Sequence, residues 1–274
     1  MPYRALRRSI DHAASVEPEV AWSICVRDRE GRDVGSYNAD AAMRTASVGK
    51  LLLLADAARQ CDTGELDGRE LLDRDPTLAV ADSGMWQHLQ ADKLSIHDLC
   101  VLVASVSDNL ATNVLLKRLG LQGVRKMSAA LGLNTAALLD YVRDQRGPDD
   151  VWTLSVGSAS EWSHFMSLVI GKDLISQSVS DQLDTWLATG VDLSMVVSAF
   201  GLDPLAHATP DRGFSLRNKT GTDAGVRADV GAIGRKGEWF SYAVIANWEA
   251  EDPALRDTVL AEMRAIGQAL KGML

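Results

Sequence analysis

The stretch RTASVGKLLLLADAARQ, residues 44–60, combines an apolar helix with a lysine near its start. Its dense Leu and Ala residues predict a helix over 48–60 that is buried on most sides. Ser47 and Lys50 lie three positions apart at the beginning of this helix, so their side chains share one face. A lysine beside buried apolar residues loses hydration, which costs free energy unless the amine has a partner or a chemical role.

Burial gives Lys50 a chemical role because it lowers the pKa of an amine and favours the neutral form. A neutral amine one turn away can take the proton of the Ser47 hydroxyl and make it a nucleophile. Backbone N–H groups at the start of the helix can stabilise an oxyanion. On its own the S-x-x-K pattern is weak evidence, since a chain of this length contains about one by chance.

The composition bounds the class of protein. The 274 residues fit one large domain or two closely packed ones, and the hydrophobic fraction of 46% and charged fraction of 24% are ordinary for a globular protein. A formal net charge of −9 argues against nucleic acid and anionic membrane surfaces as partners. No stretch is long and apolar enough to predict a membrane span. No metal-ligand cluster or phosphate-binding glycine loop is visible, so no metal or cofactor is expected.

The N-terminal segment MPYRALRRSIDHAASVEPEV has arginines but no apolar region behind them, so it does not read as a secretory signal. It predicts an amphipathic helix with Tyr3, Leu6 and Ile10 on one face. We therefore expect a cytoplasmic location, or an exported one if a leader peptide is removed. Three scattered cysteines fit a reducing compartment, where they act as small buried hydrophobic residues: Cys25, Cys61 and Cys100.

The order of elements predicts an α+β fold. Two strands around a turn at residues 29–31 follow the first helix, and nearly all signals between residues 45 and 186 are helical. Ser95 and Ser158 mark helix starts with capping boxes. Strands return after residue 189, and a helix beginning at Pro253 closes the chain. We expect a discontinuous sheet domain from 1–44 and 188–274, an all-helical domain over 45–187, and an active site between them.

Two further triplets change the weight of the S-x-x-K pattern. Ser107-Asp108-Asn109 falls in a break between two helices, and Lys219-Thr220-Gly221 falls in a predicted strand. Each triplet has a chance expectation of roughly 0.05 in such a chain, so the three in this order arise by accident with odds on the order of 10⁻³ or less. The set resembles the signature of class A serine β-lactamases and penicillin-binding proteins. SVSDNLATNVLLKRLG, residues 105–120, also resembles the class A helix pair around S-D-N.

The resemblance implies a role for each motif residue. It makes Ser47 the acylated nucleophile, Lys50 its base, and Ser107 a proton carrier toward the leaving nitrogen. It implies that Asn109 holds a substrate amide and that Lys219 lies against Ser107 near a substrate carboxylate. The carboxylate would also contact hydroxyl groups in the Lys219–Thr222 strand, and the backbone N–H groups of Ser47 and Thr222 would form the oxyanion hole. The substrate-binding residues of that strand would be Thr220, Gly221 and Thr222, and the contacting hydroxyl groups would be those of Thr220 and Thr222.

Two more side chains are candidates for the site. Arg227, eight residues past Lys219, is a candidate second anchor for the carboxylate, because a guanidinium pairs with a carboxylate through two hydrogen bonds. A solvated strand arginine is the alternative. Trp86 could line the entrance, although an ordinary core tryptophan fits the pattern better.

The sequence departs from the class A pattern in one loop. Class A enzymes keep a Glu there that activates the deacylating water, but ALLDYVRDQRGPDDVWTLSVG, residues 137–157, has Arg143 where the Glu is expected. Asp144 is the best substitute, and three other carboxylates of the loop are alternatives: Asp140, Asp149 and Asp150. They could equally well pair with Arg143 and Arg146 on the surface. The acylation machinery therefore looks complete and the deacylation machinery does not.

The sequence leaves three functions open. The leading one is hydrolysis of a β-lactam or related cyclic amide through a Ser47 acyl-enzyme, with a small carboxylate-bearing substrate as the partner. The second is a cytoplasmic esterase, amidase or peptidase of the same fold. The third is a penicillin-binding or sensor-like protein that is acylated and barely turns over.

Overall fold

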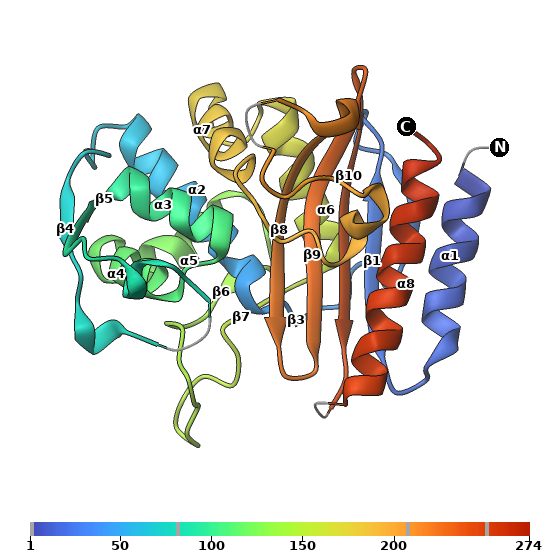
Figure 1. Cartoon of the computed structure of the whole chain (residues 1–274), viewed down its shortest axis with the longest axis horizontal. Coiled ribbons are helices and arrows are strands. Elements are labelled where there is room, and N and C mark those ends of the chain that lie inside the picture. Colours follow the sequence, from blue (N-terminus) through green and yellow to red (C-terminus); the bar gives the residue numbers. More distant parts are fainter. Residues whose placement is uncertain (1–2, 81–82, 207–208, 250–251) are drawn as a thin grey trace.

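Strands from the two ends of the chain form one antiparallel sheet in the computed structural model, which describes residues 3–80, 83–206, 209–249 and 252–274 (Figure 1). The strand order is β2-β1-β10-β9-β8. The first strand pairs with the last, with Ala21 opposite Asn247. The bounds are β1 (Ala21–Arg27), β2 (Asp33–Tyr37), β8 (Ser215–Asp223), β9 (Val226–Arg235) and β10 (Glu238–Asn247).

Helices cover both faces of this sheet. The terminal helices α1 (Tyr3–Val16) and α8 (Pro253–Lys271) lie side by side on one face, and α6 (Ala159–Gly171) packs on the other (Figure 1). Because both faces are covered, β10 has a nearly continuous buried run. The predicted apolar face of the first helix is confirmed, with Leu6 and Ile10 buried.

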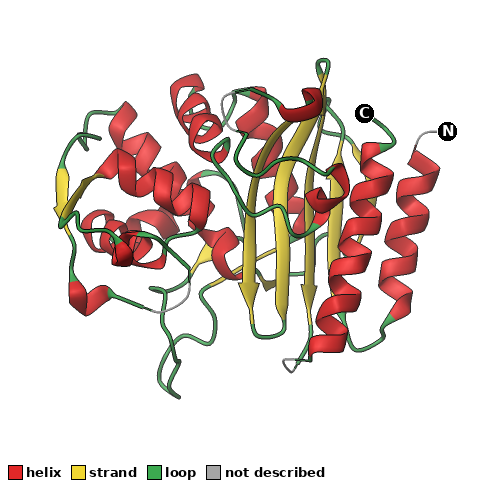
Figure 2. Cartoon of the chain, viewed as in Figure 1, coloured by secondary structure: helices red, strands yellow, loops and turns green. Residues whose placement is uncertain are grey.

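The remaining helices gather beside the free edge of β8 (Figure 2). They share one apolar core with α6 and with the sheet face that α6 covers. Trp86 is fully buried in this core, as a core tryptophan should be. The bounds are α2 (Lys50–Asp62), α3 (Ile96–Val106), α4 (Asn109–Leu119), α5 (Leu121–Ala130) and α7 (Gln177–Leu187). The predicted division of the chain at residues 44 and 187 stays a prediction.

The middle of the chain is less purely helical than its sequence predicts. It contains short strands that pair in two small sheets, and such two- and three-residue strands are too short to show an alternating pattern. The strands are β3 (Met43–Arg44), β4 (Leu71–Asp73), β5 (Lys93–Ser95), β6 (Ala137–Leu138) and β7 (Ser155–Gly157).

Helix caps follow the sequence closely. The hydroxyls of Ser95 and Ser158 accept hydrogen bonds from the backbone N–H groups of Asp98 and Glu161, which confirms both predicted helix starts. The buried helix predicted over 48–60 begins as an α-helix at Lys50, after a 3₁₀ turn η1 (Ala46–Gly49). Ser47 therefore lies in the turn that leads into α2.

Two further features concern the protein surface and its thiols. Among the described residues, no helix has the length and apolar character needed to cross a bilayer. The cysteines are not paired in disulfides: Cys25 and Cys100 are buried, and Cys61 is partly exposed.

Candidate active site

The turn η1 that carries Ser47 packs directly against the edge strand β8. A Cβ atom at Gly221 would lie 2.1 Å from the Thr45 carbonyl oxygen and 3.2 Å from the Ser47 nitrogen. Real side chains do not tolerate the shorter distance, so glycine is required there. Glycine thus brings the backbone of β8 against the backbone that precedes and includes Ser47. This contact places two predicted motifs beside each other.

A cavity of about 240 Å³ lies at this junction. Residues from three of the elements named above meet around it: the turn η1, the C-terminal end of α3 and the edge strand β8. The segment between α7 and β8 closes another side. The motif residues in its lining are Ser47, Ser107, Lys219, Thr220 and Thr222, and Gly190, Val191 and Asp192 come from the closing segment.

Lys50 lies behind Ser47 and is fully buried. Its Nζ donates to the Ser107 carbonyl oxygen at 2.7 Å and to the Asn109 Oδ1 at 2.8 Å, and it lies 3.1 Å from the Ser107 hydroxyl. Burial holds the pKa of Lys50 well below its ordinary value, and the positive charge of Lys219 adds to the effect. The neutral amine that the sequence predicts is therefore the form that this environment favours.

Lys219 approaches the same hydroxyl from β8. Its Nζ donates to Ser107 Oγ at 3.0 Å and to the Thr220 carbonyl oxygen at 2.7 Å. Burial lowers the pKa of Lys219 to about 8, while the carboxylates of Asp192 and Asp229 oppose the shift. At neutral pH most of Lys219 is therefore protonated.

The Ser107 hydroxyl thus lies between two buried amines, each with a pKa that burial lowers. When Lys50 is neutral, its two N–H groups can serve the two shorter contacts, which leaves its lone pair to accept a proton from a hydroxyl group at the site. The Lys219 ammonium donates to the oxygen of the same hydroxyl. This arrangement can move a proton from one side of the cavity to the other through Ser107.

The backbone is left-handed at Ser107 and at the residue that precedes Ser47. Ser107, the C-cap of α3, has φ +56°, and Ala46, which precedes Ser47, has φ +47°. Left-handed backbone is unfavourable for residues with a Cβ and persists where the surroundings enforce it. Asp108 helps to hold the backbone in this conformation. Its carboxylate accepts from the backbone N–H groups of Met85, Trp86 and Ala111 and so fixes the start of α4.

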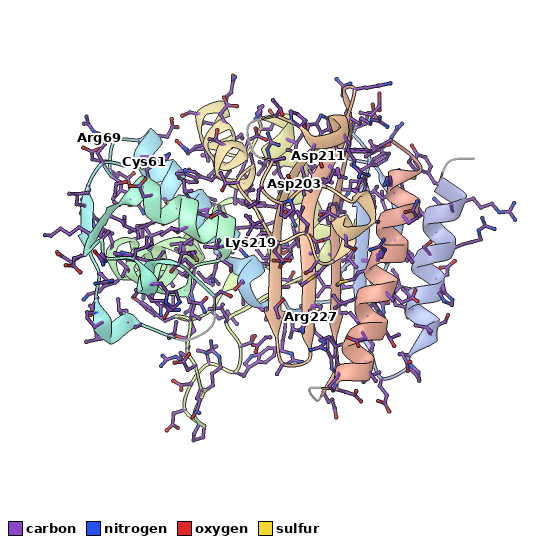
Figure 3. All side chains as sticks on the ribbon, in the orientation of Figure 1. Cys61, Arg69, Asp203, Asp211, Lys219 and Arg227 are labelled. Atoms are coloured by element: carbon purple, nitrogen blue, oxygen red, sulfur yellow. The ribbon has the colours of Figure 1, made fainter. Side chains whose placement is uncertain are left out.

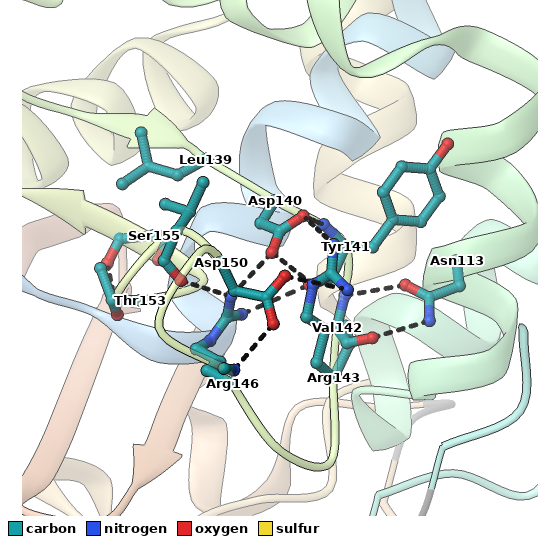
Figure 4. Close-up of polar contacts among 12 residues, drawn as sticks. Asn113, Leu139, Asp140, Tyr141, Val142, Arg143, Arg146, Asp150, Thr153 and Ser155 are labelled. Atoms are coloured by element: carbon teal, nitrogen blue, oxygen red, sulfur yellow. Dashed lines mark hydrogen bonds and ion pairs between the residues drawn. The ribbon is translucent and has the colours of Figure 1, made fainter.

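In the loop after β6, two carboxylates, Asp140 and Asp150, are held by arginines (Figure 4). Asp140 accepts from the guanidinium groups of Arg143 and Arg146, each at 2.7 Å, and Arg143 also lies 3.4 Å from Asp150. Burial opposes ionisation of Asp140, but these arginines hold the pKa of that carboxyl below its usual range. Asp140 therefore pairs with both arginines, as the sequence alternative has it, but as a buried carboxylate and not on the surface.

Three other predicted residues are not part of the described lining of the cavity. Asp144 is exposed, and no residue of the 139–153 loop is among the described residues that line the cavity. Arg227 donates to the carbonyl oxygens of Asp223 and Val226 and lies 5.9 Å from the Trp248 ring centre. Figure 3 shows Arg227 toward the β8–β9 turn, away from Lys219. Asn109 contacts Lys50 and is nearly buried, and its side chain does not contribute to the described lining.

Sequence reasoning missed three polar residues around the site. Asn113 in α4 exchanges two hydrogen bonds with the backbone of Val142 and so fixes the loop just before Arg143 (Figure 4). Asp192 accepts a 2.6 Å hydrogen bond from the Thr220 hydroxyl. Asp229 in β9 is fully buried, near Asp192 and Lys219. A polar residue on the apolar face of a helix was the available signal for Asn113, whereas Asp192 lies in a segment without periodicity.

Asp229 gives the site a pH-dependent stability. Burial, with the nearby Asp192, raises the pKa of Asp229 to about 7. Because the folded-state pKa exceeds the unfolded one, this carboxyl contributes most below about pH 4, and the contribution is lost as the pH rises through 7. Between pH 5 and 8 the parent should lose on the order of 2 kcal/mol of unfolding free energy that Asp229→Asn does not lose.

Urea unfolding at both pH values measures this difference. Asp223→Asn is the matched control, since Asp223 is exposed at the end of the same sheet. An equal pH dependence in the parent and Asp229→Asn would contradict the assignment.

Residues 4–271 match the Beta-lactamase enzyme family. No curated protein matches the chain. A β-lactamase from Sphaerobacter thermophilus is similar in structure, with a TM-score of 0.83 at 21% identity over 98% of this chain and 96% of that chain.

Two further solved structures carry the same fold. PBP-A superposes with a TM-score of 0.80 at 19% identity, over 98% of this chain and 96% of that chain. An ancestral class A β-lactamase superposes with a TM-score of 0.81 at 20% identity, over 98% of this chain and 100% of that chain. These matches confirm the predicted α+β fold with its antiparallel sheet, terminal helices and helical region. With the family matched along nearly its whole length, the chain belongs to the Beta-lactamase enzyme family and has its serine hydrolase fold.

Proposed function

We propose that this protein is an acyl-transfer serine hydrolase that forms an acyl-enzyme on Ser47 and releases it slowly. One observation carries the proposal: the Ser107 hydroxyl lies between the amines of Lys50 and Lys219, beside the cavity that Ser47 lines. A base, a proton carrier and a cation together can serve the formation and collapse of a tetrahedral intermediate.

In the acylation step, Lys50 takes the proton of the Ser47 hydroxyl, and Ser47 Oγ forms a bond to the substrate carbonyl carbon. The carbonyl oxygen becomes an oxyanion, which the N–H groups of Ser47 and Thr222 stabilise. When the bond to the leaving nitrogen or oxygen breaks, Ser107 gives that atom a proton and regains one from Lys50. The products are the Ser47 ester and a free amine or alcohol.

Deacylation needs a water molecule and a base. The carboxylates of the loop after β6 are poorly suited to act as that base. The buried carboxylate, Asp140, is engaged by two arginines, and Asp144 is exposed. Loss of a general base typically slows the step that it serves by 10²- to 10⁴-fold. This observation favours a long-lived acyl-enzyme over rapid turnover.

The substrate class we propose is a strained cyclic amide of the β-lactam type or an activated ester. The structural relatives include β-lactamases and a variant of PBP-A captured as an acyl-enzyme with penicillin G. A protein that stays acylated, as a penicillin-binding or sensor-like protein does, is the second candidate, and the arginine-paired loop carboxylate favours it.

The test follows acylation and release in one experiment. The protein is mixed with para-nitrophenyl phenylacetate, a neutral activated ester, while nitrophenolate release and intact mass are recorded. We expect a burst near one equivalent, a phenylacetyl adduct, and a slow steady rate. A cephalosporin at millimolar concentration tests the cyclic-amide class in the same way. Ser47→Ala should abolish the burst and the adduct.

Two loop variants test the slow release. Asp144→Asn and Asp140→Asn should both leave the steady rate at the slow value of the parent. If Asp144→Asn alone traps the adduct, Asp144 is a relocated base and slow release is the wrong reading. A mass adduct that persists in Ser47→Ala removes Ser47 from the role of nucleophile.

A further inference from the structure

The cavity already holds a carboxylate of the protein at the place where the family resemblance puts a substrate carboxylate. Asp192 lines the cavity, and its Oδ2 lies 2.6 Å from the Thr220 hydroxyl. Its Oδ1 accepts from both the backbone N–H and the hydroxyl of Ser194. These contacts fix the carboxylate in its position rather than leaving it free to turn away.

The Thr220 hydroxyl cannot serve a substrate carboxylate in this arrangement. A hydroxyl has one proton, and a carboxylate only accepts hydrogen bonds, so the 2.6 Å contact uses the one donor that the Thr220 hydroxyl has. What the hydroxyl still offers the cavity is its lone pairs. It can therefore accept from an N–H group but cannot donate to an anion.

The charges around the cavity lead to the same conclusion. Among the described residues that line it, Lys219 is the one cation and Asp192 the one anion. Asp192 is near enough to Lys219 to counter the fall in the pKa of that amine. The ammonium of Lys219 also donates hydrogen bonds to Ser107 Oγ and to the Thr220 carbonyl oxygen, which leaves less of it to bind a substrate anion.

Arg227, which would have supplied a second positive charge, is directed elsewhere. Its guanidinium donates to the Asp223 and Val226 carbonyl oxygens, and it is outside the described lining. An anionic substrate group would thus meet Asp192 without a second cation to balance it.

We propose that Asp192 sets the substrate class of this site by selecting an amino group, as an ammonium or a neutral N–H donor, in place of a carboxylate at Thr220. The inference rests on the proposed acyl-transfer function of Ser47. It assigns Asp192 a specificity role that acts on binding and orientation, separate from the proton transfers at Ser107.

The experiment uses two phenylacetyl esters that differ in the leaving phenol, meta-carboxyphenol or meta-(aminomethyl)phenol. Acylation rates are measured at neutral pH and low ionic strength, and each is divided by the alkaline hydrolysis rate of the same ester. We expect the parent to prefer the amino ester by at least 10-fold, because like charges a few ångströms apart in a half-buried site repel strongly. Added salt should reduce the preference.

Asp192→Asn should lower that preference toward one, because the amide keeps the shape of the side chain and removes its charge. Asp223→Asn removes an equal charge from an exposed position outside the described lining and should keep the parent preference. If Asp192→Asn does not fold, Asp192→Ser serves in its place. A parent that prefers the carboxy ester, or an unchanged ratio in the folded Asp192 variant, overturns the proposal.

A fluorophosphonate separates this inference from the function on which it rests. That probe reacts with an activated serine and has no group that must reach Thr220. If Ser47 is labelled but the parent prefers the carboxy ester, the role of Asp192 is refuted while the proposed function of Ser47 stands. If neither the fluorophosphonate nor the esters label Ser47, both the proposed function and this inference fail.

Discussion

Replacement of Lys50 by Arg is expected to slow acylation of Ser47 by about 10³- to 10⁴-fold, the upper range for loss of a general base. A guanidinium stays protonated inside proteins and cannot take the serine proton. The environment of Lys50 is built for the opposite state, since burial and the Lys219 charge both lower the pKa of its amine. The fully buried site also has no room for a larger group without a shift of its neighbours.

Lys219→Arg is the matched comparison. Both lysines are buried and both contact Ser107 Oγ, so a general intolerance of arginine would affect the two variants alike. We expect Lys219→Arg to keep measurable acylation because its role needs a positive charge. The burst rate with para-nitrophenyl phenylacetate measures both. Acylation by a folded Lys50→Arg at the parent rate would remove Lys50 from the role of base.

Gly221→Ala is expected to reduce acylation on the order of 10³-fold and to lower the free energy of unfolding by about 3 kcal/mol. The new methyl group would lie 2.1 Å from the Thr45 carbonyl oxygen, so β8 and the turn η1 must move apart. Ser47 and Thr222 belong to the two segments that meet at that contact. Their separation would misplace the N–H groups that we propose as oxyanion donors.

Gly68→Ala provides the control for a glycine replacement in general. A Cβ at Gly68 meets the Cys61 sulfur at 3.7 Å, an ordinary contact, and Gly68 does not have a positive φ. We expect its burst rate and its urea midpoint to stay close to those of the parent. If Gly221→Ala acylates as fast as Gly68→Ala, the close approach of β8 to the turn is not needed for catalysis.

The sequence predicts the fold and the candidate site for a common reason. The motifs that begin at Ser47 and Ser107 fall at the starts or ends of helices, and the one at Lys219 lies within β8, so their placement follows from the order of helices and strands. The fold brings the three segments to one cavity. The short strand pairs were missed because two or three residues cannot display a period.

The sequence could not decide which acidic residues face the site. Asp140, Asp144 and Asp192 all lie in irregular segments, where the direction of a side chain depends on the local backbone path. Asp140 turns to two arginines, while Asp192 turns into the cavity to meet Thr220. Aspartates that look equivalent in the sequence therefore have different surroundings.

The sheet joins the ends of the chain, and this has a consequence for synthesis on the ribosome. Ser47 is made early, but the strand β8 that completes its surroundings spans Ser215–Asp223, and β1 finds its partner β10 only near the C-terminus. Contacts between such distant segments form late in folding, because the intervening loop must first be closed. The nascent chain therefore carries Ser47 without Lys219 or the Thr222 N–H group, and the proposed nucleophile gains its full surroundings only after β8 has been translated.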